Sequence, residues 1–197
     1  MLTGMRRGEL CGVQWDDVDW PGQRVTVRRS VWQVRSAWGL KDPKTHQIRT
    51  IALDDAAISL LGARRARAED DATGAGVTLA DVAFVWSAQV DGHAPRTPNS
   101  ITRAFHRLCE TMERESGTEW SFRFHDLRHL SATEMVGQGM DPRTVASRLG
   151  HADPSVTLRV YSHALEARDR QAAEGLGRAL SASPGTDTGT DTGDGIQ

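Results

Sequence analysis

The stretch FHDLRH, residues 124–129, brings two histidines, an aspartate and an arginine together in a short space. Because positions i, i+3 and i+4 share one face of a helix, His125, Arg128 and His129 could all contact one bound ligand. Two kinds of ligand suit these three side chains. The HxxxH spacing resembles the zinc-binding helix of metalloproteases, whereas imidazole and guanidinium groups one turn apart suit an anion such as a phosphate.

The residues around these histidines argue against zinc. The metalloprotease pattern needs a glutamate directly after the first histidine, and Asp126 is one methylene too short to reach a zinc-bound water. Arg128 would also place a fixed positive charge beside the metal. The two cysteines, Cys11 and Cys109, lack the paired spacing of a zinc site and are interpreted as buried free thiols. We therefore expect neither a metal nor another cofactor.

Composition excludes several classes of protein. A chain of 197 residues with 38% apolar content can form one compact domain or two small ones. Its apolar runs are far shorter than a membrane span, and two arginines near the start interrupt the region where a signal peptide is apolar. These features predict a cytoplasmic protein without a membrane partner. The formal charge of -2 also argues against a uniformly basic nucleic-acid binder.

Positive charge is nevertheless concentrated between Gly22 and Thr50, where Asp42 is the one acidic residue. This basic segment predicts contacts with DNA phosphates. The residues expected to make them are Arg28, Arg29, Arg35, Lys41 and Arg49. Judged alone, the segment is equally compatible with a solvated basic hairpin that binds nothing.

The elements that must position these residues follow from hydrophobic periodicity. Residues 3–15 have the pattern of a helix, and residues 24–32 have the β-branched composition of a strand. Residues 36–43 are expected to pair back on that strand, and residues 47–53 are expected to form a third. Residues 44–47 form the turn between the last two strands. Asp54 or Asp55 caps a helix that ends near Ala72, and residues 81–88 form a short buried segment.

Helical patterns dominate the rest of the chain. They cover residues 100–117, 124–139, 141–150, 153–164 and 166–181. Residues 183–197 lack apolar residues that could hold them in a core and are predicted to be disordered. The expected fold is therefore α+β and mainly helical, with a small three-stranded antiparallel sheet.

The order of the motifs points to a known family. TGMRRGEL, a lysine in a hairpin turn, HDLRH, LGH and a tyrosine ten residues further on together resemble the catalytic domain of the tyrosine recombinases, also called the phage integrase family. The resemblance covers about residues 1–180, which sets the expected catalytic domain at residues 1–182. It implies site-specific DNA strand transfer through a 3′-phosphotyrosyl intermediate, double-stranded DNA as the partner, and a homo-tetramer on two DNA sites.

The resemblance also implies roles for individual residues. The six catalytic residues it implies are Arg6, Lys44, His125, Arg128, His151 and Tyr161. Arg7 and Lys41 stand close enough to Arg6 and Lys44 to be alternatives. Glu9 matches the acidic residue that supports the first arginine of the family.

Chemistry supports these assignments. Guanidinium groups match the non-bridging oxygens of a phosphorane-like transition state, and a phenol needs nearby positive charge and a proton acceptor to become a nucleophile. Tyr161 is the only tyrosine of the chain, and there are only two lysines among 24 basic residues. A lysine retained in the hairpin turn fits a general acid, because arginine does not readily release a proton.

The resemblance implies an N-terminal core-binding domain and a helix before TGMRRGEL, and we expect the given sequence to lack both. Two alternatives to a recombinase stay open. One is a catalytically silent remnant that binds DNA weakly, and the other is a nicking enzyme similar to type IB topoisomerases, since that group shares the Arg, Lys, Arg, His and Tyr chemistry.

Overall fold

The computed structural model describes residues 3–41, 48–80, 82–151, 173–175 and 177–178. Lys44 and Tyr161 lie outside this range, as do the helix predicted at residues 153–164 and the tail predicted to be disordered. Most of the helix predicted at residues 166–181 also falls outside it. Within the described part of the chain, no helix is both long enough and apolar enough to cross a bilayer.

The N-terminal half is built on a small antiparallel sheet. Helix α1 (Arg7–Gly12) and the short helix η1 (Trp15–Asp17) lead into strands β1 (Val18–Asp19) and β2 (Arg24–Val27). The strand order is β1-β2-β5, where β5 is Arg49–Ala52, so the three-stranded antiparallel sheet is confirmed. Its strands differ from those expected, because β1 takes the place of residues 36–43.

The strand predicted at residues 24–32 is divided in two. β2 ends at Val27, and β3 (Ser30–Val34) pairs with β4 (Ala37–Lys41) in a separate two-stranded sheet. At the break, the Arg29 Nη1 atom lies 2.7 Å from the buried Asp17 Oδ2, and the Arg28 Nε atom lies 3.3 Å from Asp17 Oδ1. These ion pairs involve the two residues between β2 and β3, and local strand propensity does not reveal them.

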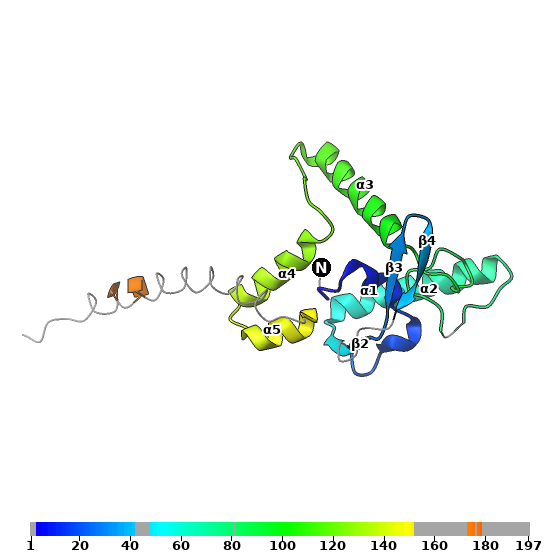
Figure 1. Cartoon of the computed structure of the whole chain (residues 1–197), viewed down its shortest axis with the longest axis horizontal. Coiled ribbons are helices and arrows are strands. Elements are labelled where there is room, and N and C mark those ends of the chain that lie inside the picture. Colours follow the sequence, from blue (N-terminus) through cyan, green and yellow to red (C-terminus); the bar gives the residue numbers. More distant parts are fainter. Residues whose placement is uncertain (1–2, 42–47, 81, 152–172, 176, 179–197) are drawn as a thin grey trace, which may run out of the picture.

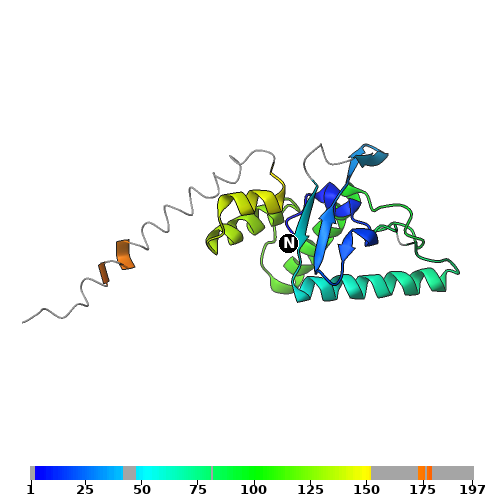
Figure 2. The same ribbon diagram turned by 90° about the horizontal axis from the view of Figure 1, so that it is seen from below.

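Helix α2 (Asp55–Gly74) begins as predicted, since the Asp54 side chain accepts a hydrogen bond from the Ala57 N–H at 2.9 Å. It packs along the sheet, as Figure 2 shows. The core between them consists mainly of Met5, Val13, Trp15, Val18, Val25, Val27, Ile51, Leu53, Ala57, Ala68, Ala83 and Val85. Both cysteines are buried free thiols, which confirms that prediction.

Three helices form the C-terminal half of the described chain: α3 (Pro98–Ser116), α4 (Asp126–Gly137) and α5 (Pro142–Leu149). Helix α3 starts beside α1 and β3 and runs outward, whereas α4 and α5 form a pair near the N-terminus (Figure 1). A second small core holds α4 against α5, and its members are Ala132, Met135, Val136, Val145 and Leu149. The two halves therefore meet around the first residues of the chain.

Candidate active site

Arg6 is held from both sides at the start of α1. Its backbone N–H donates to Glu9 Oε2 at 2.8 Å, and its Nη1 donates to Glu9 Oε1 at 2.9 Å. The Nη2 atom donates to the carbonyl of Gly150, which ends α5. The side chain is still 38% exposed, so a ligand can reach it. Arg7, the alternative to Arg6, instead donates to Thr102 Oγ1 on α3 at 2.6 Å.

Arg128 lies in the first turn of α4, where only 5% of the residue is exposed. Its Nη1 donates to the carbonyl of Gly4. Among the described residues, its Nη2 is buried and has no hydrogen-bond partner. Burial, followed by the charge of Arg6, lowers the pKa of Arg128 to about 10. The site therefore contains a desolvated cation with an unused donor, next to a second cation.

Two glycines allow these segments to approach closely. Gly4 has a φ of 61°, and a Cβ atom there would lie 2.3 Å from Leu149 Cδ2. Gly150 ends α5 in the left-handed conformation at φ 68°. The following His151 N–H donates back to the Ala146 carbonyl at 2.9 Å, as in a Schellman turn. The LGH motif is thus a helix end that places His151 beside the two arginines.

The histidines are in a strongly positive environment. Burial, then the charges of Arg128 and Arg6, lower the pKa of His151 to about 4. Partial burial, then His129 and Arg128, also lower the pKa of His125. The rings of His125 and His129 meet edge to face with centroids 4.8 Å apart. At neutral pH, His125 and His151 are therefore neutral, so each has one nitrogen that can donate and one that can accept a proton.

Glu9 is shared by two arginines. Arg49 Nη1 donates to Glu9 Oε1 at 3.1 Å and Arg49 Nη2 donates to Glu9 Oε2 at 2.7 Å, while Arg6 binds both oxygens from the other side. Burial alone raises the pKa of this carboxyl, but the hydrogen bonds and charge of Arg49, with the bonds from Arg6, bring it below its ordinary value.

Sequence reasoning placed Arg49 in the basic segment and missed this contact. The sequence did contain a signal for it. Arg49 stands two residues before the buried Ile51, so both side chains lie on the inner face of β5.

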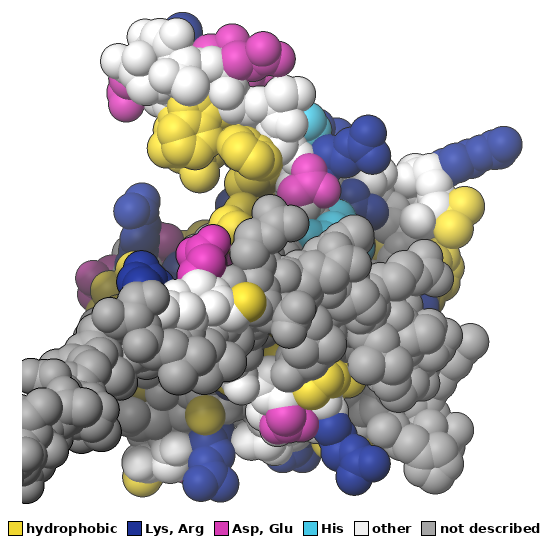
Figure 3. All heavy atoms as spheres, turned by 90° about the vertical axis from the view of Figure 1, so that its left-hand side faces the viewer, with side chains coloured by type: hydrophobic (Ala, Val, Ile, Leu, Met, Phe, Trp, Pro, Cys, Tyr) yellow, Lys and Arg dark blue, Asp and Glu magenta, His cyan; other side chains and the backbone are white. Residues whose placement is uncertain are grey.

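The structure brings together four of the six expected catalytic residues: Arg6, His125, Arg128 and His151. The other two, Lys44 and Tyr161, lie outside the described residues. Histidine and arginine side chains gather on the face shown in Figure 3. A hollow of about 760 Å³ opens beside Arg6 and His125. No set of three or more His, Cys, Asp or Glu side chains suited to a metal ion was found in the described part of the chain.

The residues expected to bind DNA are in different environments. Arg35 in the β3–β4 turn and Lys41 at the end of β4 are exposed. Arg28 and Arg29 pair with Asp17, although the Arg28 side chain remains 53% exposed. The Arg49 side chain is only 9% exposed, which leaves it little surface for a DNA phosphate.

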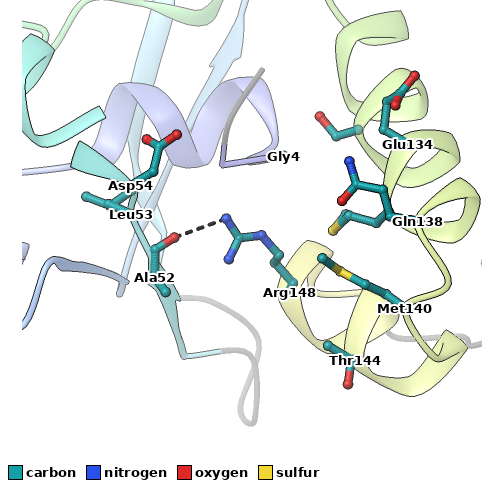
Figure 4. Close-up of a pocket in the computed structure, with 11 residues that line it drawn as sticks. Gly4, Ala52, Leu53, Asp54, Glu134, Gln138, Met140, Thr144 and Arg148 are labelled. Atoms are coloured by element: carbon teal, nitrogen blue, oxygen red, sulfur yellow. Dashed lines mark hydrogen bonds between the residues drawn. The ribbon is translucent and has the colours of Figure 1, made fainter. Parts of the chain in front are cut away.

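A second hollow, of about 620 Å³, lies between the end of β5 and the helices α4 and α5. Figure 4 shows Arg148 crossing it, and its Nη2 donates to the Ala52 carbonyl at 3.0 Å. Met135 and Met140 line the helical side. Neither Arg6 nor Arg128 lines this hollow, so it is separate from the arginine cluster.

The chain is similar to known proteins over most of its length. The chain resembles a XerC-like tyrosine recombinase of Caldanaerobacter subterraneus subsp. tengcongensis, with 29% identity over 187 residues that cover 88% of this chain and 46% of the relative. It is 24% identical to the ICEBs1 integrase of Bacillus subtilis over 176 residues, which cover 89% of this chain and 46% of that protein. The chain thus spans about half the length of these curated relatives.

Solved structures share the fold. The Tn1549 transposon integrase, in complex with a circular intermediate DNA, superposes with a TM-score of 0.71 at 24% identity, covering 89% of this chain and 55% of that one. The XerA recombinase superposes with a TM-score of 0.61 at 22% identity, covering 86% and 52%. The profile described as "Phage integrase family" matches residues 1–168. Because this match covers most of the sequence, the chain belongs to the phage integrase family.

Proposed function

We propose that this chain is the catalytic domain of a site-specific DNA recombinase that makes and reseals strand breaks through a 3′-phosphotyrosyl bond to Tyr161. The observation that carries the proposal is the buried Arg128 Nη2, which has no partner among the described residues and lies next to the accessible Arg6. A buried guanidinium with an unused donor is costly unless an anion completes it. A DNA phosphate is such an anion.

The charge of the cluster suits phosphoryl transfer. Three guanidinium groups, those of Arg6, Arg49 and Arg128, face the single carboxylate of Glu9, which leaves an excess of two positive charges. A phosphodiester carries one negative charge and gains a second as the attacking oxygen adds to phosphorus. The site therefore matches the transition state better than the ground state, which is the requirement for catalysis.

The remaining steps are assigned from the family resemblance and from the pKa values. As the Tyr161 oxygen bonds to phosphorus, the neutral His125 takes the phenol proton. The bond from phosphorus to the 5′ oxygen breaks, and Lys44 protonates that oxygen. The neutral His151 donates a hydrogen bond to the phosphate. A 5′ hydroxyl from the partner strand then attacks phosphorus and gives its proton to the now neutral Lys44. The bond from phosphorus to the Tyr161 oxygen breaks, and His125 returns the proton to the phenol, so the covalent bond conserves the energy for resealing.

The proposed partner is double-stranded DNA, bound by a homo-tetramer that joins two sites in the cytoplasm. Two related structures, of the Tn1549 integrase and the XerH recombinase, are complexes with DNA and support this choice. Arg35 and Lys41 are exposed and are proposed to contact the DNA backbone next to the active site.

The test is covalent capture. The chain is incubated with a pool of nicked duplexes of randomised sequence, in which cleavage releases a short fragment and traps the adduct. We expect DNA that stays attached to the chain after denaturation, and no such DNA with Tyr161→Phe. If the pool is retained only without denaturant, the chain binds DNA without cutting it, and the proposal is wrong.

A further inference from the structure

We infer that Arg49 is a positioning residue of this site: it orients Glu9, and through Glu9 it holds Arg6 in place for the phosphate. This inference rests on the proposed function and adds a residue to it. The motifs that point to the active site do not include Arg49, and the resemblance gives it no catalytic role.

Arg49 connects three elements that meet at the site. From β5, its Nη1 and Nη2 bind both oxygens of Glu9 on α1 at 3.1 and 2.7 Å. Its Nε donates to the carbonyl of Arg148 at the end of α5 at 2.9 Å. The Arg49 and Glu9 side chains are each 9% exposed, so water competes little for these bonds.

Gly150 leaves the space that Arg49 occupies. A Cβ atom at Gly150 would lie 2.6 Å from Arg49 Nη1 and 2.7 Å from Arg49 Cζ. The Gly150 carbonyl also accepts the hydrogen bond from Arg6 Nη2. The glycine of the LGH motif therefore contacts both arginines, which ties the position of His151 to the same network.

The charges around Glu9 explain why two arginines are needed. The charged groups that face it are Arg6 from the start of α1, Arg49 from β5 and Arg128 from α4. If Glu9 paired with Arg6 alone, it would neutralise that guanidinium and weaken its attraction for a phosphate. Arg49 supplies the compensating charge, so Glu9 can fix the geometry of Arg6 while the site keeps its positive excess.

Arg49→Met should therefore change the titration of Glu9. Burial raises the pKa of this carboxyl, and the variant removes the hydrogen bonds and charge that oppose burial most strongly. We expect the midpoint of the Glu9 titration, followed by carboxyl ¹³C NMR, to rise by about one pH unit or more. Once Glu9 is protonated, the Arg6 amide loses its carboxylate partner, so its protection from hydrogen exchange, taken relative to the intrinsic rate at each pH, should decrease as the pH falls.

The same variant should slow DNA cleavage in a way that depends on pH. In the capture assay we expect the adduct to form about tenfold to a hundredfold more slowly with Arg49→Met, and the acidic limb of the rate profile to move to higher pH. Arg49→Lys should recover part of the rate, because it restores the charge but not the paired hydrogen bonds. The double variant Glu9→Gln with Arg49→Met should remain slow but lose the shifted limb, because no carboxyl is left to titrate.

The matched control is Arg67→Met, which removes one positive charge from an exposed position on α2. It should leave the Glu9 midpoint, the Arg6 amide and the cleavage profile as in the wild type. If Arg49→Met leaves the Glu9 midpoint and the Arg6 amide unchanged, the inference is wrong, whatever the DNA assay shows. If both change but the wild-type chain forms no adduct, the contact stands and the proposed function fails.

Discussion

The variant Arg128→Met distinguishes the effect of Arg128 on the free energy of unfolding from its effect on phosphate binding. Burial, followed by the charge of Arg6, lowers the pKa of Arg128 to about 10, so the folded protein disfavours this charge by about 3 kcal/mol. Removing the guanidinium relieves that cost, but it also removes the hydrogen bond to the Gly4 carbonyl, which is worth about 1.5–3 kcal/mol. The two effects nearly cancel, so we expect the free energy of unfolding to change by less than about 1.5 kcal/mol.

Phosphate binding should change far more than stability does. Inorganic phosphate at ten times its dissociation constant should stabilise the wild-type chain by about 1.4 kcal/mol, and Arg128→Met by almost nothing. Urea unfolding with and without phosphate measures both quantities, and Arg67→Met serves as a charge-matched control. A loss of stability well above about 3 kcal/mol would show that Arg128 is mainly structural. Equal stabilisation of both proteins by phosphate would show that the anion binds elsewhere.

Three further predictions follow from buried ionisable groups. Because the pKa of His151 is lowered to about 4 in the folded chain, its contribution to stability is complete above its ordinary value of 6.5 and is lost as the pH falls toward 4. Between pH 7 and 4, the free energy of unfolding measured with urea should fall by about 2 kcal/mol more for the wild type than for His151→Gln. Parallel plots of this free energy against pH would contradict the prediction. Asp17→Ala should lower the free energy of unfolding by about 3 kcal/mol, because it leaves the half-buried Arg29 without its carboxylate. A decrease below about 1 kcal/mol in thermal unfolding would refute this. Burial raises the pKa of Cys11 to about 11, so Cys11 should react with iodoacetamide only in molecules that have unfolded, and rapid modification of the native protein read by mass spectrometry would count against the fold.

The parts of the fold that depend on local chemistry could be predicted from the sequence. Asp54 and Asp141 cap their helices because their side chains reach N–H groups two or three residues ahead, and this spacing is visible in the chain. The order of the motifs, which is that of a known family, led us to expect six catalytic candidates at one site, and four of them lie together. For Lys44 and Tyr161, whose positions lie outside the described residues, the assignment stays a prediction.

Contacts between distant residues were not predictable in the same way. At the break between β2 and β3, Arg29 reaches Asp17, and Arg49 reaches Glu9, the partner of Arg6, across 40 residues. In each case the sequence shows a basic residue in a basic segment, and only the folded chain shows which carboxylate it meets. Charge patterning therefore identified a surface expected to bind DNA, whereas three of its arginines, Arg28, Arg29 and Arg49, pair with buried carboxylates.

The central claim is that one DNA phosphate is held by Arg6 and Arg128 while Tyr161 attacks it. The most direct measurement is mass spectrometry of the covalent adduct after protease and nuclease digestion, carried out on the wild type and on Arg128→Met. We expect a nucleotide on the peptide that contains Tyr161, and none when Arg128 is replaced. A nucleotide attached to another residue, or an adduct that forms equally well without Arg128, would contradict it.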